Sequence, residues 1–322
     1  MAALGVSFWP TGLNYKAVAD LGRLAEERGF DGVFVVEGGH VNDAMASAQA
    51  VALATQRVTI GTGIANLYLR HPALLGAGAV AIDELSGGRF ILGIGASNPR
   101  LITSLGIPWK EARTALRETT GWLRQVFAGE RRPELFAPFR PAQHPIPIHW
   151  AGVALETAEL AGEMADGLML YLVTKERFKQ AVARMQQGAR KAGRDSKDVT
   201  VTLLIPTFLS EDLGAARQAA RQFLSFYSSI PVYATMFRRS GFEMEIERIA
   251  EATAQGDQAR GAACISDRMI DEIVLVGPVA RCKERLAAFH ETGVDYPIIA
   301  HQAVEEDSMT AARRLIEAFG PC

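Results

Sequence analysis

Few side chains in this 322-residue sequence stand where they could do chemistry. One carboxylate and one imidazole, Glu37 and His40, follow an apolar run at residues 32–36. These are the side-chain types that most often act as general acids and bases. We therefore take Glu37 and His40 as candidate catalytic residues. The other candidates, which follow further apolar runs, are glycines, amides, hydroxyls and aromatic residues.

Several kinds of active site are not indicated. The six histidines form no HxH pair or comparable cluster, so no metal site is expected. The sequence has neither a GxSxG nucleophile elbow nor a GxxxxGK[ST] phosphate loop. Its three cysteines include no CxxC pair, which indicates neither a disulfide framework nor a structural zinc ion. What remains is typical of a site for a flat cofactor, where backbone and apolar side chains hold the ring and the cofactor supplies the reaction.

Short apolar runs alternate with amphipathic segments along the chain and would position these residues. We predict eight strands in a (β/α)8 barrel, because repeated right-handed βαβ units close a parallel sheet. An open doubly wound sheet is the alternative, but no GxGxxG follows the first strand. Pro206 predicts an end or a bulge in the seventh strand. The predicted strands cover residues 4–8, 32–36, 58–62, 90–94, 148–151, 167–170, 199–209 and 296–300.

The chain is expected to form one domain, residues 1–322, with insertions at about 129–147 and 215–271, after the fourth and seventh strands. A formal charge of -2 gives no field that would attract nucleic acid or an anionic membrane, so the expected partner is a small molecule. The sequence has no long apolar segment, and its cysteine use fits a reducing compartment, so we expect a cytoplasmic protein.

The stretch at residues 85–99 joins a helix end, a turn, a strand and a glycine-containing loop. Gly87 and Gly88 can adopt the positive φ that ends a helix and reverses the chain. Small residues from Gly95 onward let a ligand approach the backbone closely, and Pro99 ends the strand. This loop is therefore a candidate binding segment.

Four motifs resemble those of the bacterial luciferase-like superfamily: GTGIAN at 61–66, DELSGGR at 83–89, LGIG at 92–95 and GVALETAELAGEMADG at 152–167. The likeness is greatest to its F420-dependent oxidoreductases, including methylenetetrahydromethanopterin reductases. It runs through most of the chain and weakens in the insertion after the seventh strand.

The resemblance implies a barrel whose third strand ends in a bulge with a non-prolyl cis peptide at Gly63-Ile64, behind the cofactor ring. It places Glu37 near the deazaflavin, and Asn98 where the reductases carry an acid, so we include Asn98 among the candidate catalytic residues. Because an amide cannot donate a proton as a general acid does, protonation would fall to Glu37, His40 or water. The implied cofactor-binding residues are Ser7, Glu37, Gly63, Ile64, Ala65, Asn66, Gly95, Ala96, Ser97, Asn98, Ala151, Gly152, Val153, Leu172 and Val173.

The resemblance thus implies an oxidoreductase that passes a hydride between coenzyme F420 and a small organic substrate. An FMN-dependent monooxygenase and a non-catalytic flavin-binding barrel stay open as alternatives. Relatives commonly dimerise through helices near the second and third strands, so a homodimer is expected.

Several of the candidate residues also have a structural interpretation. Glu37 could be a capping carboxylate, His40 a solvated loop residue, and His149 a core histidine. Asp83 and Glu84 are interpreted as structural. The aromatic residues of the second insertion, among them Tyr227 and Tyr233, are either core or a lid over the barrel mouth.

Overall fold

Eight parallel strands close into a barrel in the computed structural model, which describes residues 3–9, 12–38, 42–133 and 135–320. The barrel strands are β1 (Gly5–Phe8), β2 (Gly32–Val35), β3 (Thr59–Thr62), β5 (Phe90–Gly95), β6 (Ile148–Ala151), β7 (Gly167–Tyr171), β8 (Thr200–Leu209) and β10 (Tyr296–His301). They pair in this order, and β10 pairs with both β8 and β1 to complete the ring. The predicted barrel is confirmed, and the open doubly wound sheet is wrong.

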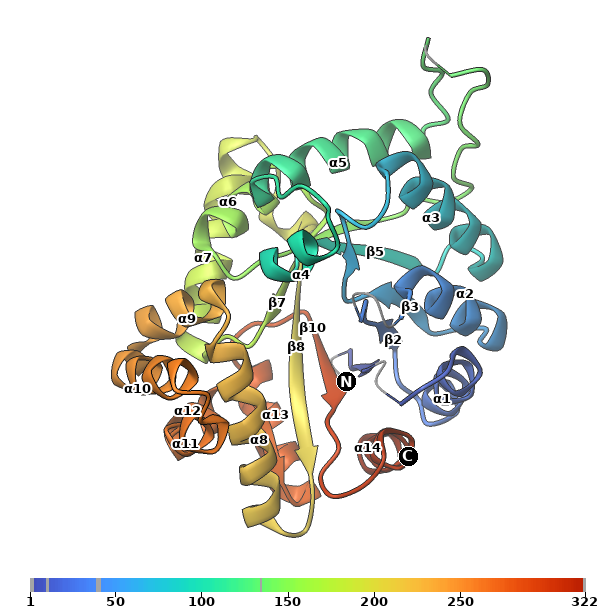
Figure 1. Cartoon of the computed structure of the whole chain (residues 1–322). Helices are drawn as coiled ribbons and strands as arrows, with labels where there is room; N and C mark the ends of the chain where they lie inside the picture. Colours follow the sequence, from blue (N-terminus) through green and yellow to red (C-terminus); the bar gives the residue numbers. More distant parts are fainter. Residues whose placement is uncertain (1–2, 10–11, 39–41, 134, 321–322) are drawn as a thin grey trace.

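Helices surround the barrel, with α1 to α3 on one side and α8 to α12 on the opposite side (Figure 1). The helices between successive barrel strands are α1 (Tyr15–Glu27), α2 (Ala44–Ala54), α3 (Pro72–Ser86), α4 (Pro99–Ser104), α5 (Ala112–Phe127), α6 (Leu155–Met164) and α7 (Lys175–Lys191). After β8 come α8 (Leu213–Ser228), α9 (Pro231–Phe237), α10 (Glu243–Ala254), α11 (Gln258–Ala263), α12 (Asp267–Ile273) and α13 (Val279–His290), and α14 (Ser308–Phe319) follows β10. No helix among the described residues is long and apolar enough to cross a membrane.

Helix boundaries follow local signals in the sequence. Asp43 accepts hydrogen bonds from the first free N–H groups of α2, and Pro72 occupies the start of α3. Gly87 and Gly88 have φ values of 65° and 85°, as predicted for the reversal after α3.

The DELSGGR motif ties loops to the barrel. The carboxylate of Asp83, 1% exposed, accepts the N–H groups of Gln143 and His144 and so fixes the irregular insertion at residues 129–147. Arg89 donates to the carbonyls of Val58 and Thr55 at 2.7 and 2.9 Å, joining the end of α2 to β3. The structural interpretation of Asp83 is confirmed.

The structure adds elements that the sequence did not predict. The two-residue strand β4 (Ala65–Asn66) pairs with β5, β9 (Leu275–Gly277) pairs with the end of β8, and α4 follows β5. The predicted end or bulge at Pro206 is wrong, because β8 continues through it in register with β10. A proline removes only one N–H donor, and pairing continues on both sides of it.

The second insertion is mostly core. Phe237 is fully buried and Tyr227 is 8% exposed, while Phe226 is 63% exposed. Tyr227 and Tyr233 pack edge to face, 5.1 Å apart, and both lie within 6.3 Å of Tyr171 at the end of β7. The core interpretation therefore holds for most of these rings, and the cluster adjoins the carboxyl end of the barrel.

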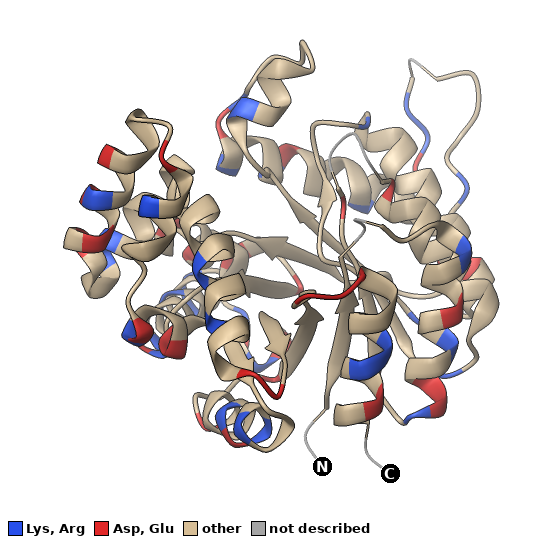
Figure 2. Ribbon diagram, turned by 60° about the horizontal axis from the view of Figure 1, so that its bottom comes forward, with Lys and Arg blue, Asp and Glu red and all other residues tan. Residues whose placement is uncertain are grey.

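The inside of the barrel is apolar and uncharged. A separate buried cluster inside the barrel combines side chains of β2, β7, β8 and β10: Phe34, Met169, Leu204, Tyr296 and Ile298. No strand among the described residues contains Lys, Arg, Asp or Glu; these lie on helices and loops (Figure 2). Any charge chemistry must therefore come from the loops beyond the strand ends.

Two buried imidazoles should make the fold sensitive to acid. Burial lowers the pKa of both His149 and His301 to about 4, against about 6.5 in an unfolded chain. Between pH 6.5 and 4 the unfolded chain binds protons that the native state does not, so stability is retained above this window and lost as the pH falls through it. We expect His149→Gln to reduce the slope of unfolding free energy against pH by about 1 kcal/mol per pH unit. Urea unfolding across this pH range measures the slope, and an unchanged slope in His149→Gln would contradict the prediction.

Candidate active site

Three predicted site segments meet at the carboxyl end of the barrel. Gly63-Ile64 follows β3, Gly95 ends β5 and Ala151 ends β6. The space at the Gly95 Cα is so confined that a Cβ there would lie 3.2 Å from Ile64 Cγ1 and 3.3 Å from Ala151 Cβ. The Gly63-Ile64 peptide is cis, which confirms the expectation drawn from the resemblance.

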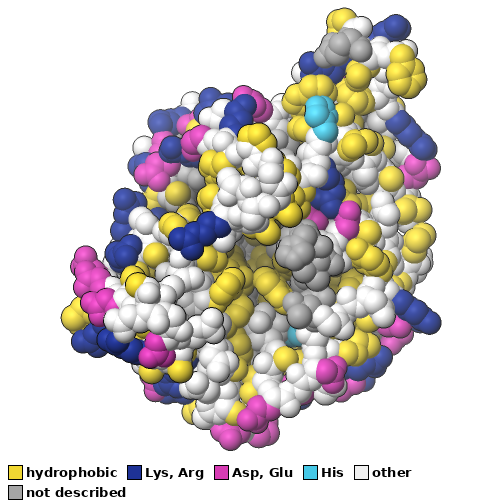
Figure 3. Space-filling model, in the orientation of Figure 1, with side chains coloured by type: hydrophobic (Ala, Val, Ile, Leu, Met, Phe, Trp, Pro, Cys, Tyr) yellow, Lys and Arg dark blue, Asp and Glu magenta, His cyan; other side chains and the backbone are white. Residues whose placement is uncertain are grey.

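Small side chains line part of the inner face of the barrel at this end. Gly63 faces Leu204 and Met169 of the interior cluster, and Ser7 lies two residues after the inward-facing Gly5. The hydroxyl of Ser7 is fully buried, yet its Oγ has no hydrogen-bond partner among the described residues. Buried polar atoms are normally paired, so this oxygen is available to bond to a ligand. Figure 3 shows hydrophobic side chains around a hollow near the middle of one face.

Glu37 holds the bulge at residues 63–66 in place. Its backbone N–H donates to the carbonyl of Ile64 at 3.1 Å, and its Oε2 accepts the N–H of Asn66 at 3.1 Å. Its Oε1 accepts the N–H of Ala44 at the start of α2. The same carboxylate accepts two hydrogen bonds from Arg70, at 2.6 and 3.0 Å. The carboxylate is thus fully engaged by the protein.

Arg70 is shared between two carboxylates. The hydrogen bond with Glu37 raises the pKa of Arg70, although burial acts in the opposite direction. The second carboxylate, Asp43, lies 2.8 Å from Arg70 and is 45% exposed, whereas the Glu37 side chain is 2% exposed. Burial alone would raise the pKa of Asp43, but hydrogen bonds from Arg70 and from the start of α2 lower it. The buried Glu37–Arg70 pair is therefore the main ionic link in this region.

The other predicted cofactor-binding residues fall into two groups. Ala65 and Asn66, in the bulge itself, are buried, and Asn66 Oδ1 accepts the N–H of Tyr68. Leu172 and Val173 are also buried. The residues that are partly or fully exposed at the rim are Ala96, Ser97, Asn98, Gly152 and Val153.

Two rim positions have a strained backbone. Ser97 after β5 and Leu172 after β7 have φ values of 58° and 57°, in the left-handed region that side chains other than glycine rarely adopt. Such conformations cost on the order of 1 to 3 kcal/mol and gather at ligand sites. This observation supports the rim as the binding region.

The candidate catalytic residues have different surroundings. Asn98 caps α4, and its Oδ1 accepts the N–H of Arg100 at 3.0 Å. His40 lies outside the described residues. The catalytic roles of Glu37, His40 and Asn98 stay predictions.

Sequence reasoning missed Arg177. It lies in the first turn of α7 and is 7% exposed, with Nη2 donating to the carbonyl of Val153 at 3.0 Å. The spacing of Thr174 and Arg177 could have drawn attention to it, because Thr174 caps the helix through the Arg177 N–H.

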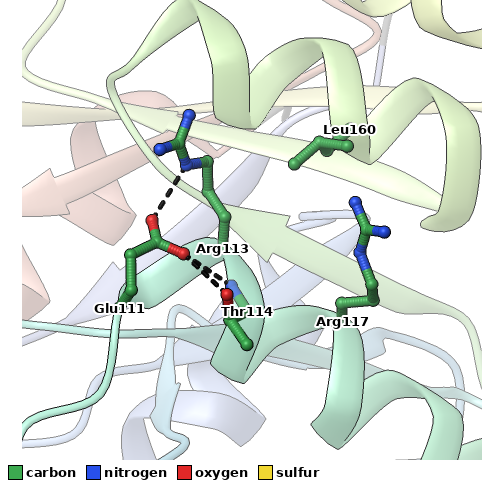
Figure 4. A pocket seen from close by; sticks show the side chains of 5 residues that line it. All are labelled: Glu111, Arg113, Thr114, Arg117 and Leu160. Carbon is green, nitrogen blue, oxygen red and sulfur yellow. Dashed lines mark hydrogen bonds and ion pairs between the residues drawn. The ribbon is translucent and has the colours of Figure 1, made fainter.

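A second cleft lies away from the barrel mouth, between α5 and α6 (Figure 4). Its lining includes Glu111 and Arg113, which bond to each other, and Arg117. All three are exposed, and none belongs to the segments that meet at the barrel mouth. No group of three or more His, Cys, Asp or Glu in the described part of the chain could hold a metal ion.

Comparison with known proteins identifies the family. A sequence model of the family described as luciferase-like monooxygenase matches residues 5–296. The chain belongs to the luciferase-like family. Within it, the chain is 28% identical over 298 residues to the 5,10-methylenetetrahydromethanopterin reductase of Methanolobus tindarius, covering 90% of this chain and 91% of that protein.

Solved luciferase-like structures share the fold. The coenzyme F420-dependent tetrahydromethanopterin reductase from Methanopyrus kandleri superposes with a TM-score of 0.81 at 21% identity, covering 99% and 98% of the two chains. An F420-dependent secondary alcohol dehydrogenase, solved with an F420-acetone adduct, gives a TM-score of 0.75 at 18% identity over 98% of each chain. The chain is thus an oxidoreductase of this family.

Glu37 can be tested against its neighbour Asp43. Glu37→Gln should lower the free energy of unfolding by about 2 kcal/mol, because it leaves the partly buried Arg70 without its main partner. It should also weaken cofactor binding, since the bulge loses its anchor. Asp43→Asn, at a half-exposed site where Asn still caps α2, should cost less than about 1 kcal/mol.

Urea unfolding and cofactor titration of both variants measure these effects. Equal costs for the two substitutions, or unchanged cofactor affinity in Glu37→Gln, would contradict the positioning role.

Proposed function

We propose that this chain is an F420-dependent oxidoreductase that transfers a hydride between the deazaflavin and a small organic substrate at the barrel mouth. The observation that carries the proposal is the uncharged surface at the strand ends, where Ile64, Gly95 and Ala151 meet; the hydroxyl of Ser7 at the end of β1, without a hydrogen-bond partner among the described residues, supports it. A flat, neutral heteroaromatic ring with polar edges fits such a surface. The F420-dependent relatives support the choice of cofactor.

The residues present fit the cofactor. Ile64 and Ala151 would contact the ring, and Ser7 Oγ would find its hydrogen-bond partner there. Backbone at Gly95 to Ser97 and at Gly152-Val153 would hold the phosphate-bearing side chain, because exposed N–H groups at helix starts favour anions.

When bound and reduced, F420 supplies a hydride from C5 of the deazaflavin. The protein contributes orientation and exclusion of water, which such a transfer needs more than it needs side-chain chemistry. Glu37 would act indirectly, through the bulge that it anchors. Because that carboxylate is engaged and Asn98 is an amide, His40 or water is left as the proton source among those expected.

A reduced FMN that reacts with oxygen is the alternative chemistry, since the family is named for its monooxygenases. Titrating the purified protein with F420 and with FMN, each followed by fluorescence, separates the two. We expect F420 to bind at least about tenfold more tightly than FMN. Tight FMN binding without F420 binding would contradict the proposal.

The unpaired Ser7 hydroxyl gives a sharper test of the binding place. Ser7→Ala removes a buried hydroxyl that has no partner among the described residues, so the free protein should be as stable as the wild type or slightly more stable. If the hydroxyl bonds to the cofactor, the same change should weaken F420 binding by about 2- to 10-fold. Unchanged F420 affinity would place the ring elsewhere.

Other expectations from the sequence stay predictions: the single-domain organisation, the cytoplasmic location and the homodimer. Exposed Leu53 on α2 and Leu74 on α3, 68% and 71% accessible, support an interface on these helices.

A further inference from the structure

Two buried polar atoms lie without a hydrogen-bond partner at the carboxyl ends of neighbouring strands. The first is the hydroxyl oxygen of Ser7, at the end of β1. The second is the side-chain amide nitrogen of Gln302, one residue past the end of β10. Neither atom has a partner among the described residues, although buried polar atoms are normally paired. This edge of the barrel therefore has unused hydrogen-bonding capacity.

The backbone fixes the direction of the Gln302 side chain. Its N–H donates to the carbonyl of Thr207 at 3.0 Å, which extends the ladder between β10 and β8 by one residue. Successive side chains of a strand alternate between its two faces. Ile298 belongs to the cluster inside the barrel, so Gln302, four residues further on, faces the same way. His301 faces the opposite way, where its Nε2 lies 3.4 Å from Ser308 Oγ at the start of α14. The Gln302 amide therefore faces the barrel mouth.

Ser7 lies on the same wall of the mouth. Like Gly5 two residues before it, Ser7 faces the interior. It pairs with Ala300, which is two residues before Gln302 and on the same face. Ala300 in turn pairs with Pro206 of β8, and neither of these two side chains can form a hydrogen bond. Ser7 and Gln302 are thus polar side chains on an otherwise apolar part of the wall.

This wall lies across the barrel from the surface proposed for the ring. In the closed ring of strands, β6 lies four strands from β1, and β5 lies four strands from β10. Gly95 and Ala151, which end β5 and β6, therefore lie opposite Gln302 and Ser7. A group that extends from that surface across the mouth meets these two side chains.

The two side chains suit an uncharged group that accepts hydrogen bonds. The Gln302 amide nitrogen can only donate, and the Ser7 hydroxyl can donate or accept. No described strand carries a Lys or Arg, so no cation on the wall itself would balance a carboxylate. Because an unbalanced buried charge is costly, a neutral carbonyl fits the wall better than an anion does.

We propose that Gln302 and Ser7 form a hydrogen-bonding wall for an uncharged carbonyl group of a ligand in the barrel mouth. The Gln302 amide donates to the carbonyl oxygen, and the Ser7 hydroxyl bonds to the same group. The inference rests on the proposed function, because the carbonyl belongs either to the pyrimidinedione edge of the deazaflavin or to an uncharged substrate beside it. Gln302 thereby fixes the orientation of that ligand.

The test uses two variants at Gln302. Gln302→Met keeps the length of the side chain and removes the donor, and Gln302→Glu replaces the donor by an acceptor. Gln218→Met, at an exposed position on α8, is the control. The probes are F420, the ribityl deazaflavin that lacks phosphate and glutamyl groups, and cyclohexanone as an uncharged carbonyl compound. Deazaflavin fluorescence gives Kd for the first two probes, and the shift in Tm of the F420-loaded protein reports cyclohexanone binding.

The protein without ligand gives the first result. Because the Gln302 amide nitrogen has no partner among the described residues, Gln302→Met should leave Tm unchanged or raise it slightly. A lower Tm than that of Gln218→Met would show that the amide stabilises the fold, and would overturn the proposal.

If the carbonyl belongs to the cofactor, both Gln302 variants weaken binding of F420 and of the ribityl deazaflavin equally, by about 3- to 10-fold. If the carbonyl belongs to the substrate, both deazaflavins bind unchanged, and the rise in Tm caused by cyclohexanone is lost in both variants. Either result supports the wall, and Gln218→Met should change neither measurement.

Weaker binding of F420 with unchanged binding of the ribityl deazaflavin would place Gln302 at the cofactor tail, and would overturn the proposal. Unchanged deazaflavin affinity together with an unchanged or absent cyclohexanone effect would also overturn it. If the wild type binds neither deazaflavin, the proposed function fails, and cyclohexanone is measured with the unloaded protein. A rise in Tm that is lost in both Gln302 variants then still supports the wall, and any other result overturns it.

Discussion

One buried carboxylate organises the carboxyl end of this barrel. Glu37 bonds through its backbone to Ile64 and through its side chain to Asn66, Arg70 and the start of α2. The connections after β2 and after β3 thereby take their positions from one residue. In the low dielectric of a buried site these bonds are strong, and losing any partner would be costly. The Glu37–Arg70 ion pair thus fixes the position of the bulge against which a ring could lie.

Different parts of the barrel provide stability and a surface for ligand binding. Large apolar side chains fill its middle, and the signature residues Asp83 and Arg89 fasten loops on the outside. At the mouth the inward positions are small, as at Ser7 and Gly95. Among the described residues, Lys, Arg, Asp and Glu lie on the helices and loops and none lies on a strand. This arrangement suits a site that positions an uncharged ring at the strand ends.

Much of the architecture could be predicted, because each barrel strand is a short, mostly apolar run bounded by loop residues. The motifs also identified the bulge at Gly63-Ile64 and the structural role of Asp83. The engagement of Glu37 could not be predicted, since Arg70 lies 33 residues away and only the fold brings the two together. Arg177 was missed because an arginine in the first turn of an amphipathic helix is usually solvated. The prediction at Pro206 was wrong because a strand can continue past one missing N–H donor.

The central claim is that the ring lies against Ile64, Gly95 and Ala151 while Glu37 holds the bulge from behind. A crystal structure of the protein with bound F420 tests this most directly. The account predicts the ring within van der Waals contact of these three residues, Ser7 Oγ bonded to it, and the Glu37–Arg70 pair intact. A ring bound in the α5–α6 cleft, or Glu37 turned away from the Asn66 N–H to contact it, would contradict the account.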